Sequence, residues 1–326
     1  MIPLNLAQIY YPPSPKVTEK LCEIVKNANV FPEIGYPKLK EKLSDYFGVE
    51  GNNILPANGL DEAIYVTAPL FKGKKVVIPL PNYAEYKNTA EINKCEIVNV
   101  SCLNDSFDLK IPERMLKTAS LIWISNPNNP TRCKVKKEKI IDIIESTKAT
   151  VVVDECYFEF CNETVIDLVN KQNNLIVLRG FGKTFALSGL RAGFIISNQE
   201  TIKKIQPTVQ PFNMNTVAAT ACIEVLSDLE YYKGRWKELA ELRSFFKKAL
   251  EDIGVFVYDS FTNFVLLRFK SKEESDKVFE ALKSNGVMTC YCDTFIITGL
   301  EGPYLRITIN NKDIMQKVVD IIKTVV

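Results

Sequence analysis

The sequence predicts an α/β fold, in which a mainly parallel sheet with helices on both faces is joined to a smaller α+β domain. Three observations support this prediction. Short apolar runs alternate with helical stretches from about residue 36 to residue 210. The runs are rich in valine, isoleucine and leucine, as is typical of strands buried on both faces. After Pro211 the alternation gives way to a long helical stretch followed by short strands.

The expected strands of the large sheet are separated by segments long enough for crossover helices. Such βα alternation indicates parallel strands, because each connection must return the chain to the same edge of the sheet. The expected strands are Lys75–Leu80, Glu96–Val100, Leu121–Ser125, Thr150–Asp154, Leu175–Leu178 and Gly193–Ser197.

The smaller domain is expected to be discontinuous, formed by residues 1–35 and 211–326, with residues 36–210 forming the large domain. The chain begins with a proline-marked arm, which a helix over Val17–Ala28 follows. The expected elements after residue 211 are a long helix over Thr216–Asp252, strands Val255–Tyr258, Phe264–Phe269 and Leu305–Ile309, and helices Lys272–Asn285 and Asp313–Val325.

Composition excludes several classes of protein. The 41 basic and 39 acidic side chains leave a formal charge of +2, so no polycationic surface for nucleic acid is expected. No apolar run approaches the roughly 20 residues that span a bilayer. The first residues lack the basic and then apolar pattern of a signal peptide, and a cytoplasmic location without membrane contact is therefore expected.

The cysteine and histidine counts restrict the chemistry further. Nine cysteines, an odd number at irregular spacing, do not form a disulfide framework typical of secreted proteins. Cys290 and Cys292 alone would make half a metal site, and no metal is expected. The chain has no histidine, which excludes Ser-His and Cys-His catalytic groups. Proton transfer is left to lysine, tyrosine, carboxylates, thiols or a cofactor.

Lys183 is the most informative residue, because it follows the apolar run Leu175–Leu178 and lies between glycine-bearing turns. A lysine at the end of a buried strand is costly without a function. Burial lowers the pKa of its amine and makes it nucleophilic, which suits a Schiff base with pyridoxal 5'-phosphate (PLP). Taken alone, the segment is equally compatible with a structural lysine.

Polar side chains at two neighbouring strand ends strengthen this interpretation. Asp154 ends one expected strand, with Tyr157 close behind, and Asn129 lies in the turn that follows the strand before it. Ligands of open α/β sheets bind beyond the carboxyl ends of the strands, so these groups should meet Lys183 in one crevice. Asp154 suits the protonated pyridine nitrogen, while Asn129 and Tyr157 suit the ring oxygen or are ordinary hydrogen-bonding groups.

The phosphate of such a cofactor has a predicted seat upstream. Asn58, Gly59 and Leu60 precede an expected helix over Asp61–Leu70, whose first N–H groups can bind an anion. Arg191 can add a bidentate contact to the phosphate. Tyr83, in the turn after the strand Lys75–Leu80, can stack on the ring or be a plain turn aromatic.

Together these motifs resemble the fold-type I PLP enzymes of the class I and II aminotransferase family, in the branch of histidinol-phosphate aminotransferases and L-threonine-O-3-phosphate decarboxylases. The resemblance covers nearly the whole chain. The motifs that carry it, in family order, are NGLDEAI, PNYAEY, NPNNPT, VVVDECYFEF, the Lys183 segment, PFNMN and YLRITI.

The resemblance implies a role for each matched position. Lys183 is implied to be the covalent cofactor lysine and proton carrier, and Asp154 the partner of the pyridinium. Asn129 and Tyr157 are implied to contact the ring oxygen and Arg191 the phosphate. Arg306 is implied to bind the substrate carboxylate, and the alternative is an ordinary surface charge. Asn213 is implied to lie near the edge of the site. Relatives are homodimers with active sites at the subunit boundary, so a homodimer acting on a small amino acid or amino-phosphate is expected.

Several positions depart from the family pattern. Gly180 and Gly182 stand where relatives usually carry hydroxyls that bind the phosphate, and Leu60 stands where a small or hydroxylated residue is usual. Phe31 stands where a tyrosine of the partner subunit often reaches the phosphate. Weaker cofactor retention is therefore expected. Cys290 replaces an arginine that binds phosphorylated substrates in relatives, so either another cation such as Arg132 or Lys134 substitutes for that arginine, or the substrate carries no phosphate. Arg132 also replaces a glycine.

Three functions from different classes follow. Transamination breaks the C–H bond of the substrate, decarboxylation by a threonine-phosphate decarboxylase-like enzyme breaks C–COO⁻, and a non-catalytic binding descendant breaks neither. No set of residues read from the sequence decides between the first two, and the general prior for the family favours histidinol-phosphate aminotransferase-like transfer of an amino group to a 2-oxo acid. A nucleotide-binding α/β protein is disfavoured, because no Gly-x-Gly-x-x-Gly or Walker motif follows a strand.

Overall fold

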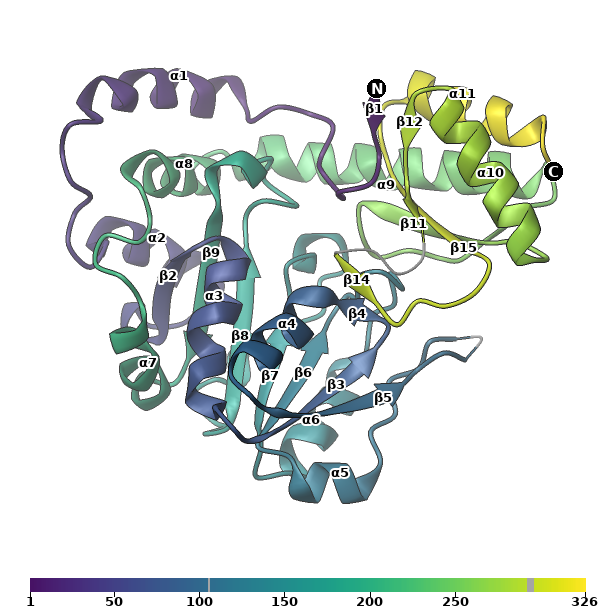
Figure 1. Ribbon diagram of the computed structural model, residues 1–326. Coiled ribbons are helices and arrows are strands. Elements are labelled where there is room, and N and C mark those ends of the chain that lie inside the picture. The colour runs from purple at the N-terminus through teal and green to yellow at the C-terminus, as the bar shows by residue number, and fades with distance from the viewer. Residues whose placement is uncertain (105, 292–295) are drawn as a thin grey trace.

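The computed structural model describes residues 1–104, 106–291 and 296–326, and its centre is a seven-stranded sheet (Figure 1). The strand order is β2-β9-β8-β7-β6-β3-β5, and β9 alone runs antiparallel to its neighbours. A mainly parallel sheet is thus confirmed. Its strands are β2 (Ile54–Asn58), β3 (Lys75–Leu80), β5 (Glu96–Ser101), β6 (Leu121–Ser125), β7 (Thr150–Asp154), β8 (Leu175–Gly180) and β9 (Ala192–Ser197).

Helices cover both faces of this sheet, as expected. Alternate residues of each central strand enter two different cores: Val151 and Val153 point to one, Val152 to the other. The first core is closed by α1 (Pro15–Ile24), α2 (Pro37–Phe47), α5 (Glu113–Thr118), α6 (Lys137–Glu145) and α8 (Thr216–Leu226), the second by α3 (Gly59–Thr67), α4 (Ala84–Ile92) and α7 (Gln199–Ile205).

A smaller sheet of order β10-β11-β15-β13 lies beside the large one, and its strands are antiparallel. The long helix α9 crosses from the large sheet to this smaller unit (Figure 1). The elements of the smaller unit are α9 (Leu229–Glu251), α10 (Lys272–Ser284), α11 (Lys312–Lys323), β10 (Phe256–Val257), β11 (Phe264–Arg268), β13 (Cys290–Tyr291) and β15 (Tyr304–Thr308).

Two short pairings connect distant parts of the chain. Strand β1 (Ile2–Pro3) pairs with β12 (Val287–Met288), which brings the N-terminal arm to the smaller unit. Strand β14 (Ile297–Thr298) pairs with β4 (Asn82–Tyr83), so the C-terminal part of the chain holds the turn that carries Tyr83.

The structure corrects two of the expected elements. The long helix expected over Thr216–Asp252 is two helices, α8 and α9, because Ser227 and Asp228 interrupt it. The hydroxyl of Ser227 donates to the carbonyl of Ile223, a local bond that competes with helix continuation. The helix expected from Asp61 begins at Gly59. The division into residues 36–210 and the two flanking ranges stays a prediction; helices α1 and α8 pack into a core of the large sheet.

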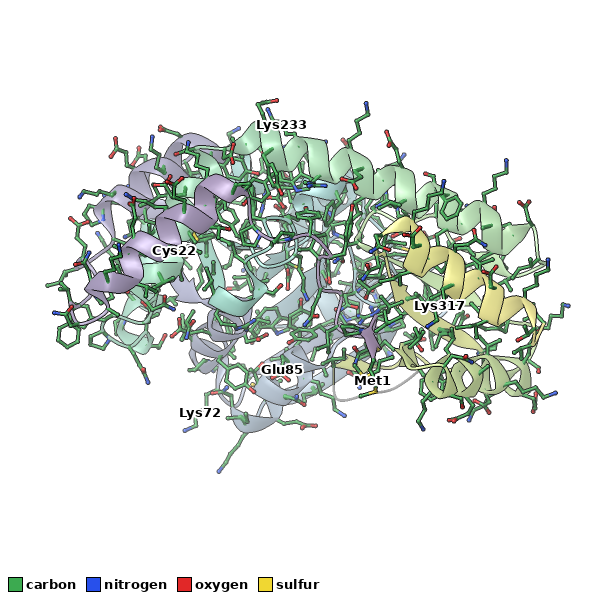
Figure 2. The ribbon with its side chains drawn as sticks, turned by 90° about the horizontal axis from the view of Figure 1, so that it is seen from above. Met1, Cys22, Lys72, Glu85, Lys233 and Lys317 are labelled. Carbon is green, nitrogen blue, oxygen red and sulfur yellow. The ribbon has the colours of Figure 1, made fainter. Side chains whose placement is uncertain are left out.

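Exposed lysines lie on different parts of the surface. Lys72, Lys233 and Lys317, all exposed, lie far apart when the molecule is seen from above (Figure 2). None of the described helices combines the length and the hydropathy needed to cross a bilayer. Within the described ranges, no three metal-ligating side chains gather; Cys292 of the proposed half site lies outside them.

One glycine contact determines how closely helix α3 approaches the sheet. Gly193 on β9 faces the start of α3, and a Cβ atom at Gly193 would lie 2.5 Å from the carbonyl carbon of Gly59 and 2.8 Å from the amide nitrogen of Leu60. Both of these are backbone atoms, which cannot rotate away. The close approach therefore requires glycine at this position.

We expect Gly193→Ala to lower the free energy of unfolding by about 1 to 3 kcal/mol, because the added methyl group must displace the start of α3. Gly234→Ala is the matched control. Gly234 lies inside α9 with open space around it, so alanine should raise stability by about 0.5 to 1 kcal/mol. Thermal and denaturant unfolding of the two variants measure the difference, and equal stabilities would contradict the steric argument.

Candidate active site

A cavity of about 360 Å³ opens at the carboxyl ends of β6, β7 and β8. Its walls come from these strand ends, from the start of α3, and from Leu6 and Gln8 of the N-terminal arm. Most of the residues singled out in the sequence line it, namely Gly59, Leu60, Tyr83, Asn129, Asp154, Tyr157, Lys183, Arg191 and Arg306.

Lys183 follows the end of β8 and points into this cavity. Its Nζ donates to the carbonyl oxygen of Leu6 at 2.9 Å, and burial lowers the pKa of its amine to about 8. The backbone of the next residue, Thr184, is held by two hydrogen bonds. The carbonyl of Thr184 accepts from the hydroxyl of Tyr11 at 3.1 Å and from the indole of Trp236 at 2.7 Å. The lysine therefore has a fixed backbone and a partly neutral amine near neutral pH.

Asp154 ends β7 and is only 3% exposed. Its carboxylate accepts from the hydroxyl of Tyr86 at 2.6 Å and from the backbone N–H of Cys156 at 3.0 Å. Burial raises the pKa of Asp154, and the two hydrogen bonds oppose that rise. None of the ion pairs among the described residues includes it. A buried carboxylate facing a cavity without a cationic partner suits a ligand that brings a positive charge.

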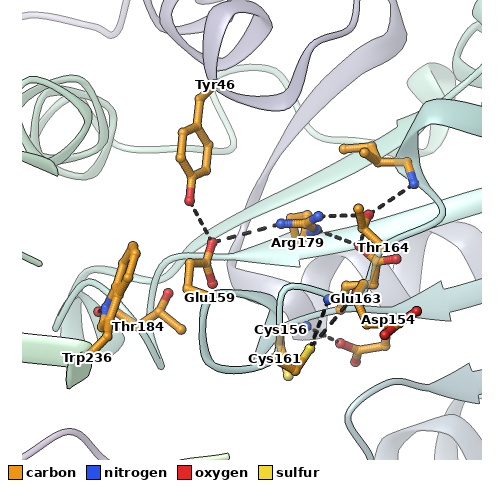
Figure 3. Close-up of polar contacts among 12 residues, drawn as sticks. Tyr46, Asp154, Cys156, Glu159, Cys161, Glu163, Thr164, Arg179, Thr184 and Trp236 are labelled. Atoms are coloured by element: carbon orange, nitrogen blue, oxygen red, sulfur yellow. Dashed lines mark hydrogen bonds and ion pairs between the residues drawn. The ribbon is translucent and has the colours of Figure 1, made fainter. Parts of the chain in front are cut away.

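A buried ion pair joins the strand ends that carry these two groups. Figure 3 shows the second carboxylate near the same arginine, Glu159, which lies 3.9 Å from Arg179. The Nε of Arg179, on β8, donates to Glu155 at 2.8 Å, and Glu155 directly follows Asp154. The guanidinium also lies 3.6 Å above the ring of Phe158. The hydroxyl of Thr164 donates to Glu155 at 2.7 Å, so the buried carboxylate is well satisfied.

The end of the cavity near α3 can bind an anion. Arg191 ion-pairs with Asp61 in the first turn of α3. Gly59 has a φ of +82°, and a Cβ there would meet the guanidinium of Arg191 at 2.7 Å, so glycine keeps this seat open. The side chain of Leu60 packs where a Cβ at Gly180 would lie. Backbone N–H groups and one arginine thus offer the main donors, and the weaker cofactor retention expected from the sequence stays a prediction.

Arg306 lies at the opposite side, on β15, and is 1% exposed. One of its terminal nitrogens donates to the side-chain oxygen of Asn129, and the other donates to the carbonyl of Asn5. Its Nε is buried and has no hydrogen-bond partner among the described residues. Each terminal nitrogen carries a second N–H, so a guanidinium on this cavity wall is suited to bind a carboxylate or phosphate.

Two aromatic side chains complete the walls. Tyr83 donates its hydroxyl to Asp61 at 2.8 Å, which orients its ring toward the cavity beside the anion seat. Tyr157 is buried with its ring edge-on to Phe264 at 5.6 Å, and burial raises the pKa of its hydroxyl. Both positions allow contact with a flat heterocycle.

Asn58 and Asn213 do not line the cavity. Both bond instead to Glu62 of α3, Asn58 through its backbone N–H at 2.5 Å and Asn213 through its side-chain amide at 2.7 Å. Asn213 also donates to the carbonyl of Pro56 at 2.9 Å. These bonds hold the start of α3 from outside the cavity. The expected contact of Asn58 and Asn213 with a ligand stays a prediction.

The two cations proposed to replace the missing arginine also lie elsewhere. The guanidinium of Arg132 packs 4.4 Å from the ring centre of Tyr258, and Lys134 approaches Glu163 at 3.5 Å. Cys290 is buried in an apolar cluster and, like both cations, does not line the cavity.

Several wall residues were missed from the sequence. Tyr86 had a detectable signal, because it is three residues beyond Tyr83 at the start of a helix and so lies near it. Leu6 and Gln8 had none, since the arm reaches the site only through contacts with residues far along the chain, the pairing of β1 with β12 and hydrogen bonds of Ala7 with Thr308 and Asn263.

The lysine of lowered pKa, the buried acid and the anion seat fit pyridoxal phosphate, whose aldehyde, pyridine nitrogen and phosphate require these three partners. The fold and the cavity thus define the class: a PLP-dependent transferase of fold type I.

Comparison with known proteins agrees with this class. The family described as aminotransferase class I and II matches residues 1–322, so the chain belongs to that family and is a PLP-dependent aminotransferase. A histidinol-phosphate aminotransferase of Thermoanaerobacter sp. (strain X514) is 37% identical over 306 residues, 91% of this chain and 85% of that protein.

Solved structures show the same fold. Histidinol-phosphate aminotransferase from Clostridium acetobutylicum has a TM-score of 0.90 at 26% identity, covering 100% of this chain and 99% of that one. L-threonine-O-3-phosphate decarboxylase from Porphyromonas gingivalis has a TM-score of 0.86 at 24% identity, covering 99% of each chain, and shows a likeness of fold alone.

The lowered pKa of Lys183 makes a prediction about cofactor uptake. Only the neutral amine attacks an aldehyde, and its fraction rises about tenfold per pH unit below the pKa. The uptake rate of pyridoxal phosphate by the cofactor-free protein should therefore rise with pH and level off above about 8, instead of near the ordinary 10.5. Stopped-flow visible absorbance measures this rate.

Lys40→Met is the control for that experiment. Burial also lowers the pKa of Lys40, but this residue lies on α2 and does not line the cavity. Its removal should leave the pH profile unchanged. A profile that still rises steeply through pH 10 in the unaltered protein would contradict the assigned environment of Lys183.

Proposed function

We propose that this chain is a histidinol-phosphate aminotransferase, which moves an amino group between an amino-phosphate or amino acid and a 2-oxo acid. The observation that carries the proposal is that Lys183 and Asp154 line one cavity together with the buried guanidinium of Arg306. Relatives bearing that activity are up to 37% identical over nine-tenths of the chain.

Each residue has a definite task in this proposal. Pyridoxal phosphate, when bound, supplies an aldehyde for the amine and an electron-withdrawing ring. Asp154 would hold the protonated ring nitrogen, because a carboxylate stabilises the adjacent charge. Arg191 and the first N–H groups of α3 would hold the phosphate. Asn129, Tyr157 and Tyr83 would hold the ring.

Lys183 carries the proton. Its Nζ would accept the proton that leaves the substrate carbon and hold it until it is returned, which is one step of amino transfer. Arg306 binds the anionic group of the substrate and so holds the C–H bond toward Lys183. Its contact with Asn129 fixes the guanidinium relative to the ring.

Reconstitution with pyridoxal phosphate tests the proposal. We expect visible absorbance of the bound cofactor, formation of its amino form on adding histidinol phosphate, and no CO₂ release. Lys183→Ala should lose the covalent absorbance and slow amino transfer by about 10² to 10⁴-fold, whereas Lys134→Ala, outside the cavity, should retain both.

Other outcomes would replace the proposal. CO₂ release from threonine phosphate without amino transfer would indicate a decarboxylase. Cofactor binding without turnover of any amine would indicate a binding protein of this fold. Absence of cofactor uptake would contradict the enzyme class itself.

We propose further that the protein is a homodimer. Phe31 and Ile34, in the segment between α1 and α2, are 77% and 82% exposed. Phe31 packs on Phe212 with ring centres 4.9 Å apart, so the two rings form one apolar surface. A second copy of this chain is the occupant we propose, because the expected subunit boundary of relatives includes the position of Phe31. The cytoplasmic location stays a prediction.

Charge on this surface should therefore separate the subunits. We expect Phe31→Asp combined with Ile34→Asp to sediment as a monomer at concentrations where the unaltered protein is a dimer. Ile92→Asp is the matched control, because Ile92 is an exposed apolar residue, 64% accessible, on α4. A dimer that survives the double change, or a fully active monomeric parent protein, would refute the proposal.

A further inference from the structure

We infer that Tyr86 is a positioning residue for the reaction, whose hydroxyl holds the carboxylate of Asp154 in the orientation and charge state that the ring nitrogen of the cofactor requires. This inference rests on the role that the proposed function gives to Asp154, and it adds a residue that acts through Asp154. Tyr86 comes from α4 and Asp154 from the end of β7. The hydroxyl of Tyr86 donates to Oδ2 of Asp154 at 2.6 Å.

The carboxylate of Asp154 is held through both of its oxygens. Oδ2 accepts from Tyr86, and Oδ1 accepts from the backbone N–H of Cys156 at 3.0 Å. Donors on two different oxygens fix the plane of the carboxylate, which a donor on one oxygen would leave free to rotate. Each oxygen has a second lone pair, so the carboxylate can still accept from a ring N–H. Tyr86 therefore orients Asp154 without using up its capacity as an acceptor.

Packing fixes the place of the Tyr86 hydroxyl. Tyr86 is 0% exposed. Its ring stacks on the indole of Trp123, on β6, with ring centres 4.7 Å apart and planes 9° from parallel. The ring of Tyr83 lies edge-on to it at 5.9 Å. Because Tyr86 is already buried within one chain, a partner subunit at the mouth of the cavity would leave these contacts unchanged.

The hydrogen bond also favours the charged form of Asp154. Burial raises the pKa of Asp154, and the bond from Tyr86 opposes this rise, as do the weaker contacts from Cys156. The nearby carboxylate of Asp61 raises the pKa of Asp154 further. Burial raises the pKa of Tyr86 well above its usual range, so this hydroxyl keeps its proton. Without the hydroxyl, Asp154 would become neutral more easily and would attract a cationic ring nitrogen less strongly.

Tyr86→Phe separates this role from packing, because phenylalanine keeps the ring that stacks on Trp123 and removes only the hydroxyl. The probes are pyridoxal phosphate and its analogue with a C–H group in place of the ring nitrogen, which keeps the aldehyde and the phosphate. We expect the change to weaken binding of pyridoxal phosphate about tenfold, as for the loss of one hydrogen bond to a charged group, and binding of the analogue less than about twofold. Calorimetry with the cofactor-free protein measures both affinities.

Turnover gives an independent readout. In the enzyme loaded with pyridoxal phosphate, we expect Tyr86→Phe to lower kcat about tenfold and to leave KM for the amine within about threefold of its original value. The reason is that the buried hydroxyl acts through Asp154 and does not contact the substrate.

Tyr46→Phe is the matched control. The hydroxyl of Tyr46 also donates to a buried carboxylate, that of Glu159 at 3.1 Å, but neither residue lines the cavity. Its loss should lower the melting temperature about as much as Tyr86→Phe does in the cofactor-free protein. It should leave kcat and the ratio of the two cofactor affinities unchanged.

The failures are distinguishable. If Tyr86→Phe weakens binding of both cofactors equally, weakens neither, or leaves kcat unchanged, the inference is overturned and the proposed function stands. If the unaltered protein binds the two cofactors equally tightly, the role proposed for Asp154 is removed, and the inference with it.

Discussion

The buried ion pair between Arg179 and Glu155 is the interaction on which the active site depends. It connects the end of β8 to the residue after β7, and so supports the strand pairing that sets the distance between the elements that carry Lys183 and Asp154. Both partners are almost fully buried, at 3% and 0% side-chain exposure. Removal of one partner of such a pair leaves an uncompensated buried charge, which costs about 3 to 5 kcal/mol. The pair therefore favours one arrangement of the two strand ends over its alternatives.

Burial acts in opposite directions on the two central groups. It lowers the pKa of Lys183 and raises that of Asp154, because in each case the charged form loses water. The lysine gains a neutral, nucleophilic amine from this effect. The aspartate instead needs its hydrogen bonds from Tyr86 and Cys156 to remain an acceptor. A cationic ring nitrogen next to Asp154 would offset the free-energy cost of burying this carboxylate, which has no ion-pair partner among the described residues. The carboxylate and the cofactor are therefore complementary in charge.

The cavity has few side-chain donors for anions. Leu60, Gly180 and Gly182 provide no side-chain donor at the anion seat, which leaves the phosphate to helix N–H groups and Arg191. Cys290 provides no cation on the substrate side. Both departures reduce the number of anion contacts. The lysine and the acid that amino transfer needs both line the cavity.

The sequence by itself determined the fold class, the strand ends and the chemistry of the site. Buried parallel strands have continuous apolar runs, and their polar ends are local patterns, so Lys183, Asp154, Asn129 and Arg191 could be found from spacing alone. Family motifs added Arg306. The break between α8 and α9 was missed because the apolar pattern continues through Ser227 and Asp228.

Only the tertiary structure decided which groups share the cavity. Asn58 and Asn213 bind Glu62 behind α3, and Arg132 packs on an aromatic ring, although the sequence allowed each of them near a ligand. The arm that brings Leu6 to Lys183 arrives through a strand pairing across almost the entire chain. Such contacts depend on packing between segments that are distant in sequence, and no local pattern of residues encodes them.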